Sequence, residues 1–131
     1  EAASKDVAAI AGLHEALSVL NQKENFKTER RLTEYAVERL KALKNVVPYI
    51  PENPESRIGV ISFNVKNYRS EDIGIILDED FDIAVRTGYH CAPYVHKYLE
   101  DEKYLGTVRV GLGRFNTEED VQRLIDAISE L

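Results

Sequence analysis

The order of helix-like and strand-like stretches is the feature that most limits what this chain can fold into. Apolar residues recur at helical spacing in residues 5–22, residues 28–44 and the chain from Asn116 onward. Short runs rich in β-branched residues lie between these stretches, at residues 46–50, 59–65, 81–85 and 107–112. Together they predict a two-layer α/β (α+β) sandwich, in which a small mixed or antiparallel sheet carries helices on one face and the N-terminal helix is long.

Individual residues set the expected boundaries of these elements. We expect Ser4 to cap the first helix and Ser70 to cap a further short one, because a hydroxyl can accept a bond from a free backbone N–H. Asn116 and Glu119 have the spacing of a capping box. Pro48 cannot donate a hydrogen bond to a ladder, so its strand is expected at an edge of the sheet.

Composition narrows the class of protein. The 131 residues are 44% hydrophobic and 31% charged, which fits one globular domain over residues 1–131. The formal net charge of −6 argues against nucleic acid as a partner. No apolar run approaches the roughly 20 residues of a membrane span. The single cysteine excludes an intramolecular disulfide, and we expect a reducing, cytoplasmic setting.

Reactive residue types gather in residues 86–96, which read Arg-Thr-Gly-Tyr-His-Cys-Ala-Pro-Tyr-Val-His. This stretch holds the only cysteine, Cys91, directly after His90 and near Arg86 and His96. Its glycine and proline indicate a turn after a strand, where a side chain is exposed. Neighbouring cations raise the thiolate fraction of a cysteine, so Cys91 is a candidate nucleophile. The alternative is a small buried hydrophobic residue, the commoner role of a lone cysteine.

Arg109 lies on the last strand-like run, and the alternation places it away from the face that Val108 and Val110 bury. Its commoner role would be a surface salt bridge. A guanidinium also binds a carboxylate or phosphate through two parallel hydrogen bonds. The cysteine and histidines of residues 86–96 match no closed zinc pattern, so no zinc site is expected. The acidic run at residues 100–102 is expected to be a solvated loop.

Several segments resemble the C-terminal part of class V aminotransferases, the group that includes cysteine desulfurases and selenocysteine lyases. The most specific are Arg-Thr-Gly-x-His-Cys-Ala at residues 86–92 and Gly-Thr-Val-Arg at residues 106–109. The likeness continues through residues 115–119, and upstream through residues 9–13 and 59–64, so it covers nearly the whole chain.

This resemblance implies the small C-terminal domain of a transferase that depends on pyridoxal 5′-phosphate (PLP). Cys91 matches the family's cysteine that attacks the substrate sulfur and retains it as a persulfide. Arg109 matches the arginine that binds the substrate α-carboxylate. Arg86 and His90 match residues that flank the entrance of the active site. The implied activity is that of a cysteine desulfurase, which converts cysteine to alanine.

The resemblance also implies parts that this chain does not supply. In the family, PLP is held by a lysine in a large upstream domain, and no lysine here lies in the matching context. A Glu-Ala-Gly-Thr segment of the family helps to bind the cofactor phosphate of the neighbouring subunit. Ser4 keeps its hydroxyl, but Ala3 replaces its glycine. Because methionine is absent even at the first position, we expect a piece of a longer protein. Since the large domain is not in this chain, the resemblance implies that the piece is inactive alone.

Two alternatives stay open beside a desulfurase. Other class V enzymes, such as an aminotransferase or a selenocysteine lyase, share the fold and the arginine but need no nucleophilic thiol. A free-standing, non-catalytic module for binding or dimerisation is the second alternative. For an intact enzyme, the family likeness implies a homodimer, with a sulfur-acceptor protein as a further partner.

Overall fold

The computed structural model describes residues 4–20 and 22–131. Its strands form one four-stranded sheet in the order β1-β2-β4-β3, and every neighbouring pair is antiparallel. The elements in chain order are α1 (Val7–Ser18), α2 (Gln22–Ala42), β1 (Val46–Tyr49), η1 (Pro54–Ser56), β2 (Val60–Val65), α3 (Ser70–Phe81), β3 (Arg86–Gly88), α4 (Pro93–Leu99), η2 (Glu102–Tyr104), β4 (Thr107–Gly111) and α5 (Glu118–Ser129).

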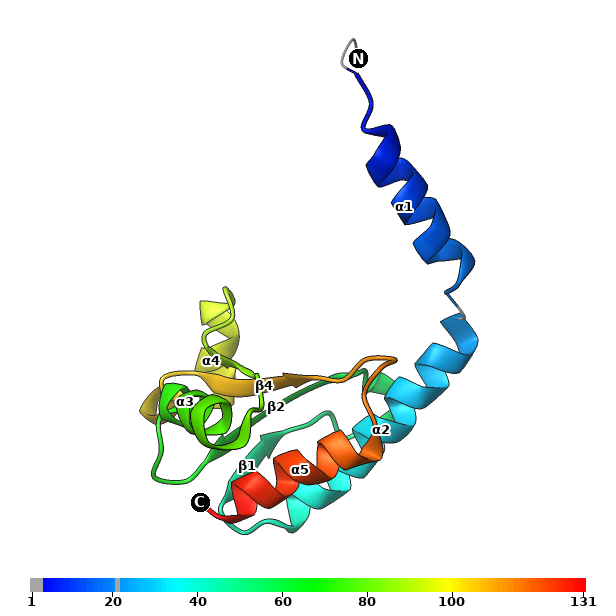
Figure 1. The fold of residues 1–131 in the computed structure, drawn as a ribbon. Helices are drawn as coiled ribbons and strands as arrows, with labels where there is room; N and C mark the ends of the chain where they lie inside the picture. The colour runs from blue at the N-terminus through cyan, green and yellow to red at the C-terminus, as the bar shows by residue number, and fades with distance from the viewer. Residues whose placement is uncertain (1–3, 21) are drawn as a thin grey trace.

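The sheet and three helices make two layers, as the order of elements predicted. Helices α2, α3 and α5 pack against one face of the sheet, and α4 lies on the opposite side (Figure 1). The sequence did not indicate α4, whose seven residues begin with Pro93. The expected α+β sandwich is therefore confirmed, with an antiparallel sheet and one additional helix beyond it.

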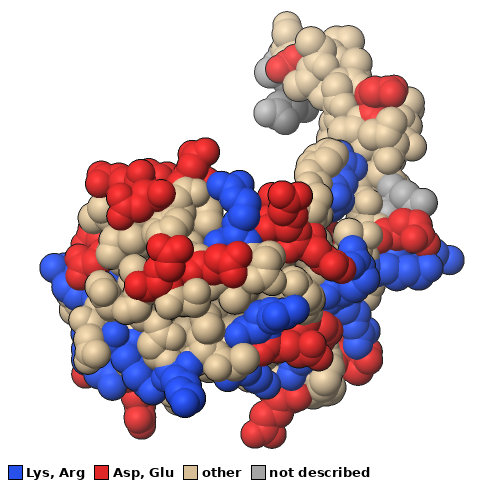
Figure 2. Space-filling model, turned by 60° about the horizontal axis from the view of Figure 1, so that its bottom comes forward, with Lys and Arg blue, Asp and Glu red and all other residues tan. Residues whose placement is uncertain are grey.

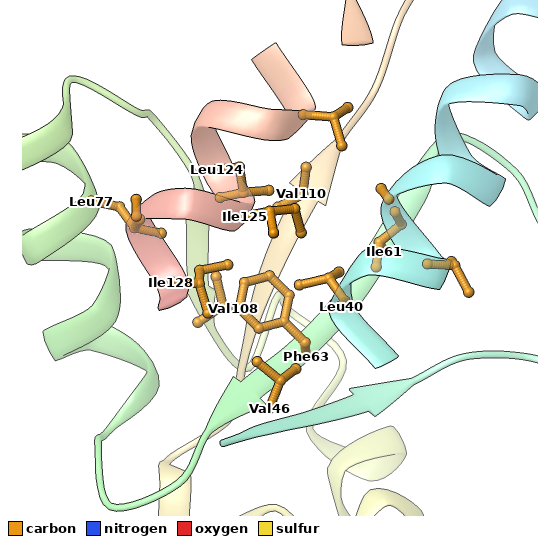
Figure 3. Close-up of a cluster of buried hydrophobic side chains, with 14 of the residues drawn as sticks. Leu40, Val46, Ile61, Phe63, Leu77, Val108, Val110, Leu124, Ile125 and Ile128 are labelled. Carbon is orange, nitrogen blue, oxygen red and sulfur yellow. The ribbon is translucent and has the colours of Figure 1, made fainter. Parts of the chain in front are cut away.

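Alternation along the two central strands builds the core. Phe63 on β2 and Val108 on β4 are fully buried and point toward the helices (Figure 3). Leu40 of α2 and Ile128 of α5 close over them from the helical layer. Burying each such side chain contributes about 1.5–3 kcal/mol. The opposite face of β2 and β4 carries polar residues, and it is this face that bears the candidate site.

The predicted edge strand is confirmed. Pro48 lies on β1, which pairs only with β2 among the described strands, so its missing N–H leaves no ladder hydrogen bond unmade. At the other edge, β3 has three residues and pairs only with β4 within the described sheet. Both edge strands are thus shorter than the two central strands, β2 and β4.

The first two helices differ from expectation at their boundaries. Asp6, rather than Ser4, caps α1, because its carboxylate accepts a hydrogen bond from the backbone N–H of Ala9 at 3.0 Å. Helix α2 begins at Gln22 instead of near residue 28, so the polar residues 22–27 between the two expected helices are helical. Lys27 pairs there with Glu24 at 2.8 Å, three residues apart on one helical face.

None of the residues in α1 is buried, although its apolar residues follow helical spacing. Leu13 is 61% exposed and Leu17 is 58% exposed. The helix extends away from the sheet (Figure 1), and few charged side chains lie along it (Figure 2). No helix in residues 4–20 and 22–131 combines the length and apolarity that crossing a membrane requires.

The strand expected at residues 81–85 is wrong. Helix α3 continues to Phe81, and the chain then turns through Asp82, whose φ is 55°. Ile83 and Val85 pack partly buried against the core in an extended connection without ladder bonds, and β3 begins only at Arg86. The apolar residues of this run can therefore pack against the core without forming a strand.

Two expected caps are also shifted by one residue. Arg69 is the N-cap of α3, while the Ser70 hydroxyl donates to the carbonyl of Leu105 at 3.2 Å and is buried. Thr117 caps α5 through a capping box with Asp120, one residue later than the predicted Asn116 and Glu119. Asn116 instead accepts a hydrogen bond from the N–H of Gly113 at 2.9 Å, which closes the turn before the helix.

Candidate active site

Cys91 lies at the tip of a tight turn between β3 and α4. The backbone N–H of Ala92 donates to the carbonyl of Tyr89 at 2.8 Å, and both central residues, His90 and Cys91, have positive φ, 51° and 60°. Positive φ at both central positions is the signature of a type I′ turn. Such turns favour glycine and asparagine, so a pair of ordinary residues there is strained and must be held by its surroundings.

The thiol of Cys91 is exposed, as the predicted turn required. This placement does not fit the alternative role of a small buried hydrophobic residue. It leaves nucleophilic attack by Cys91 as a prediction, because exposure makes a thiol accessible without making it reactive.

Arg86 and Arg109 lie side by side on the polar face of the sheet. They are directly paired between β3 and β4, and Ser62 on β2 is the next residue across. Neither guanidinium forms an ion pair or a side-chain hydrogen bond with any residue in the described part of the chain. The surface salt bridge that was the alternative for Arg109 is therefore not present there. Two adjacent unpaired guanidiniums form a site for an anion.

His90 connects the turn to β4. Its Nε2 lies 3.1 Å from both the carbonyl oxygen and the Oγ1 of Thr107, so Nε2 carries the proton that the carbonyl accepts. Burial lowers the pKa of His90 below its ordinary 6.5, and the positive charge of Arg109 lowers it further. His90 is thus neutral at pH 7, and its buried Nδ1 has no partner among the described residues.

His96 and Asp101 form a buried pair behind the turn. His96 is 4% exposed and Asp101 is wholly buried, and Nδ1 of the ring lies 2.6 Å from Oδ2 of the carboxylate. Nε2 of the same ring lies 3.0 Å from the carbonyl of Tyr89. The expectation of a solvated acidic loop is wrong for Asp101. Glu100 and Glu102 beside it are exposed, so nothing in a run of three acids marked the middle one.

The structure brings four of the predicted site residues together and leaves the fifth apart. His90, which precedes Cys91, reaches Thr107 on β4, two residues before Arg109, which pairs with Arg86. Ser4 precedes α1 and is exposed, and α1 itself extends away from the sheet (Figure 1). Residues 1–3 of the matching segment lie outside the described residues. Across the described chain, no group of three or more His, Cys, Asp or Glu residues is arranged to hold a metal ion.

This small α+β domain, with an exposed cysteine on the turn after β3 and a pair of arginines on β3 and β4, has relatives among known proteins. Residues 1–124 match the family described as Aminotransferase class-V, and the chain belongs to that family, whose members depend on PLP. The cysteine desulfurase of Klebsiella pneumoniae strain 342 is 34% identical over 135 residues, which cover all of this chain and 31% of the relative. A cysteine desulfurase of Escherichia coli O1:K1 is similar to the same extent. The chain spans about a third of the length of these relatives.

Solved structures agree with the sequence comparison. The apo cysteine desulfurase from Thermococcus onnurineus NA1 matches 79% of this chain and 25% of its own, with a TM-score of 0.72 and 36% identity. The cysteine desulfurase CsdA from E. coli, in an S-sulfonic acid form, matches 99% of this chain and 31% of its own, with a TM-score of 0.78. At 23% identity the second likeness shows the fold alone. The chain is thus homologous to the C-terminal region of cysteine desulfurases.

Proposed function

We propose that this chain is the small C-terminal domain of a PLP-dependent cysteine desulfurase, which converts cysteine to alanine and leaves a persulfide on Cys91. One observation carries the proposal. The exposed thiol lies on a turn that His90 fastens to Thr107 on β4. Arg109, with its unpaired guanidinium, lies two residues after Thr107 on the same strand. A sulfur acceptor and a carboxylate-binding group therefore lie on neighbouring segments of one surface.

The two arginines give this surface its affinity for an anion. Arg109 can bind the α-carboxylate of an amino acid through two parallel hydrogen bonds, and Arg86 adds a second positive charge beside it. Because no described acidic residue neutralises either guanidinium, a substrate carboxylate does not have to displace an existing partner. The pair thus orients the substrate so that its sulfur can face the turn.

Cys91 then accepts the sulfur. Its thiolate forms a sulfur–sulfur bond with the substrate while the substrate's carbon–sulfur bond breaks. The carbon keeps the electron pair of the broken bond and takes up a proton, so alanine leaves and Cys91 retains a persulfide. PLP supplies the electron sink for this cleavage. Two free guanidiniums fit an anionic substrate held next to that cofactor.

The remaining parts of the enzyme belong to the proposal as well. A large domain, outside this chain, would supply the lysine that binds PLP. The intact enzyme would be a cytoplasmic homodimer in which Ser4 contributes to the phosphate site of the neighbouring subunit. It would pass its sulfur to an acceptor protein, and the isolated chain would be inactive. What supports these statements is the family and the share of the relatives that the chain covers.

The test uses the intact protein that contains this chain, loaded with PLP and supplied with cysteine. Cys91→Ser is expected to abolish protein-bound persulfide and to lower alanine formation about 100-fold or more, because the thiol is the proposed acceptor. Persulfide is measured by mass spectrometry and alanine by amino-acid analysis. Undiminished alanine formation would favour another class V reaction, and absence of PLP binding would favour a non-catalytic module.

The arginine is tested separately. Arg109→Gln is expected to raise the KM for cysteine about 10- to 150-fold, the equivalent of a charged hydrogen bond. Arg114→Gln is the matched control, because Arg114 lies exposed beyond β4 against the ring of Phe115. A KM that changes equally in both variants would contradict the assignment of Arg109.

A further inference from the structure

His96 lies between two hydrogen-bond acceptors. Nδ1 faces a carboxylate oxygen of Asp101 at 2.6 Å, and Nε2 faces the carbonyl oxygen of Tyr89 at 3.0 Å. The two ring nitrogens thus join two oxygens, one on the side chain of Asp101 and one on the backbone of Tyr89. One ring therefore links the buried carboxyl group to the turn.

Asp101 fixes the ring of His96 from one side. Its carboxyl group is wholly buried, and the other oxygen, Oδ1, has no partner among the described residues. Within the described chain, the buried carboxyl group therefore has its hydrogen bond with His96. The rings of Tyr89 and His90 also face His96, with centroids 5.0 and 6.1 Å away. The pair is thus enclosed, and among the described residues its one hydrogen bond to the turn is with the carbonyl of Tyr89.

That carbonyl is the acceptor that closes the turn of Cys91. It receives the N–H of Ala92 at 2.8 Å as well as Nε2 of His96. The two residues between them, His90 and Cys91, have positive φ, a conformation that persists only where neighbouring contacts hold it. His90 fixes one side of the turn to β4, and His96 fixes the other side to α4.

We propose that the His96–Asp101 pair is a positioning device for Cys91. Asp101 holds Nδ1 of His96, and Nε2 of His96 holds the carbonyl of Tyr89, so the turn presents the thiol in one place. This inference rests on the proposed function, in which Cys91 must meet the substrate sulfur. His96 and Asp101 touch neither substrate nor cofactor in this proposal, and they act through the turn.

Two substitutions of His96 separate this role from a purely structural one. The amide nitrogen of glutamine reaches about as far as Nε2, and that of asparagine about as far as Nδ1. His96→Gln therefore keeps a donor for Tyr89 and loses the one for Asp101, whereas His96→Asn does the opposite. A positioning role predicts that the glutamine variant is the milder one. A role in stabilising Asp101 predicts that the asparagine variant is the milder one.

The first readout is hydrogen exchange of the peptide covering residues 89–95, followed by mass spectrometry in the intact protein. We expect His96→Asn to speed exchange in this peptide about fivefold, the equivalent of one hydrogen bond, and His96→Gln to leave it within twofold of wild type. A peptide from β2 reports whether the core stays folded. His14→Gln and Glu102→Gln, both at exposed positions, are the controls and should change nothing.

The second readout is steady-state kinetics of alanine formation. His96→Asn should lower kcat while the KM for cysteine stays unchanged, because Arg109 still binds the carboxylate. If exchange responds as expected but Cys91→Ser leaves the reaction intact, the positioning role stands and the proposed function fails. Equal exchange in both His96 variants, or no change in either, overturns the positioning role whatever the activity.

A lone buried carboxylate can unfold the domain, so both His96 variants are also made together with Asp101→Asn, which removes the charge. The same order, glutamine milder than asparagine, is expected in this background. If all four variants lose the β2 core signal, the pair supports the whole fold rather than the turn, and the proposal is overturned.

Discussion

His90 and His96 have ring centroids 6.1 Å apart, yet they fasten the turn of Cys91 to different parts of the domain. His90 donates from Nε2 to Thr107 on β4, while burial and the charge of Arg109 lower its pKa. His96 lies on α4, between the carboxyl group of Asp101 and the carbonyl of Tyr89. The turn of Cys91 is therefore held by two rings, one bonded to a strand and the other carried by a helix.

The lowered pKa of His90 predicts how stability changes with pH. Its pKa in the folded chain lies below the ordinary 6.5, so between the two values the unfolded chain holds a proton that the folded chain does not. The free energy of unfolding should thus fall as the pH drops through 6.5, down to the folded pKa, and be unaffected above this window. His90→Gln should reduce this fall between pH 7 and pH 5, measured by urea unfolding at each pH.

His14→Gln is the control for that measurement, because His14 is exposed on α1. It should leave the pH dependence as it is in the wild type. If His90→Gln and wild type lost the same stability between pH 7 and pH 5, the lowered pKa of His90 would be wrong.

For single residues, the sequence predicted which face of a strand a side chain lies on better than it predicted whether the side chain is buried. Alternation placed Arg109 on the polar face, because a strand has a strict period of two. The burial of Asp101 could not be predicted, since it depends on a tertiary contact. Asp101 lies at the start of η2, and His96 of α4 packs against it there. The pairing of Arg86 with Arg109 likewise required the register of β3, which a three-residue strand does not reveal.

Gly74 determines how closely α3 approaches the sheet. A Cβ at this position would lie 2.6 Å from Cγ2 of Thr87 on β3, closer than side-chain carbons approach one another. Gly74→Ala should therefore lower the free energy of unfolding by about 1–3 kcal/mol, even though alanine favours the helix. Thr87→Ser removes the methyl group in question and should restore most of this loss. Chemical denaturation of the single and double variants measures both effects.

Gly12→Ala is the matched control, since Gly12 also lies within a helix but has no atom within 4 Å of its Cβ position. The free energy of global unfolding should not decrease in this variant. An equal loss in Gly12→Ala and Gly74→Ala would show that α3 does not depend on close contact with Thr87.

Thr117 fixes the start of α5. Its hydroxyl accepts the N–H of Asp120 at 3.2 Å, and the carboxylate of Asp120 accepts the N–H of Thr117 at 2.9 Å. Thr117→Ala should lower the free energy of unfolding by about 0.5–2 kcal/mol, because this helix carries much of the core. Ser129→Ala at the exposed other end should stay within about 0.5 kcal/mol. Thermal unfolding of the two variants compares the ends of one helix, and equal losses would contradict the cap.

Element boundaries show why prediction from sequence was incomplete here. Asn116 and Thr117 are both good caps, and only the hydrogen bond from Gly113 to Asn116 assigns the cap to Thr117. The run from Phe81 to Val85 has the composition of a strand, but its apolar side chains pack partly buried against the core without a ladder. For this run, local composition predicted the contact with the core, and tertiary contacts decided the secondary structure.

The molecule as a whole divides into a packed body and an exposed N-terminal helix. Leu40 is fully buried between α2 and the sheet, whereas Leu13 is 61% exposed on α1. Leu40→Ala should lower the free energy of unfolding of this chain by about 2–5 kcal/mol. Leu13→Ala should change it by no more than about 0.5 kcal/mol. Urea unfolding followed by circular dichroism measures both, and a large effect at Leu13 would mean that α1 packs on the body.

The layers of the fold followed from sequence, and the order of strands in the sheet did not. Helical and alternating periods identify which faces are apolar, and these faces have few ways to cover one another. The order β1-β2-β4-β3 instead depends on β4 entering between two earlier strands. Such pairings join segments far apart in the chain, so no local pattern encodes them.

That insertion has a consequence for the order in which the molecule folds. Strands β1 and β2 are neighbours in sequence, whereas Ile61 on β2 must meet Val110 on β4 across more than a third of the chain. Closing long loops costs more entropy than closing short ones, so pairings between distant segments follow pairings between near ones. Arg86 on β3 and Arg109 on β4 are closer in sequence than Ile61 and Val110 are. By the same rule the two arginines come together before β4 pairs with β2, so their pairing precedes the complete sheet.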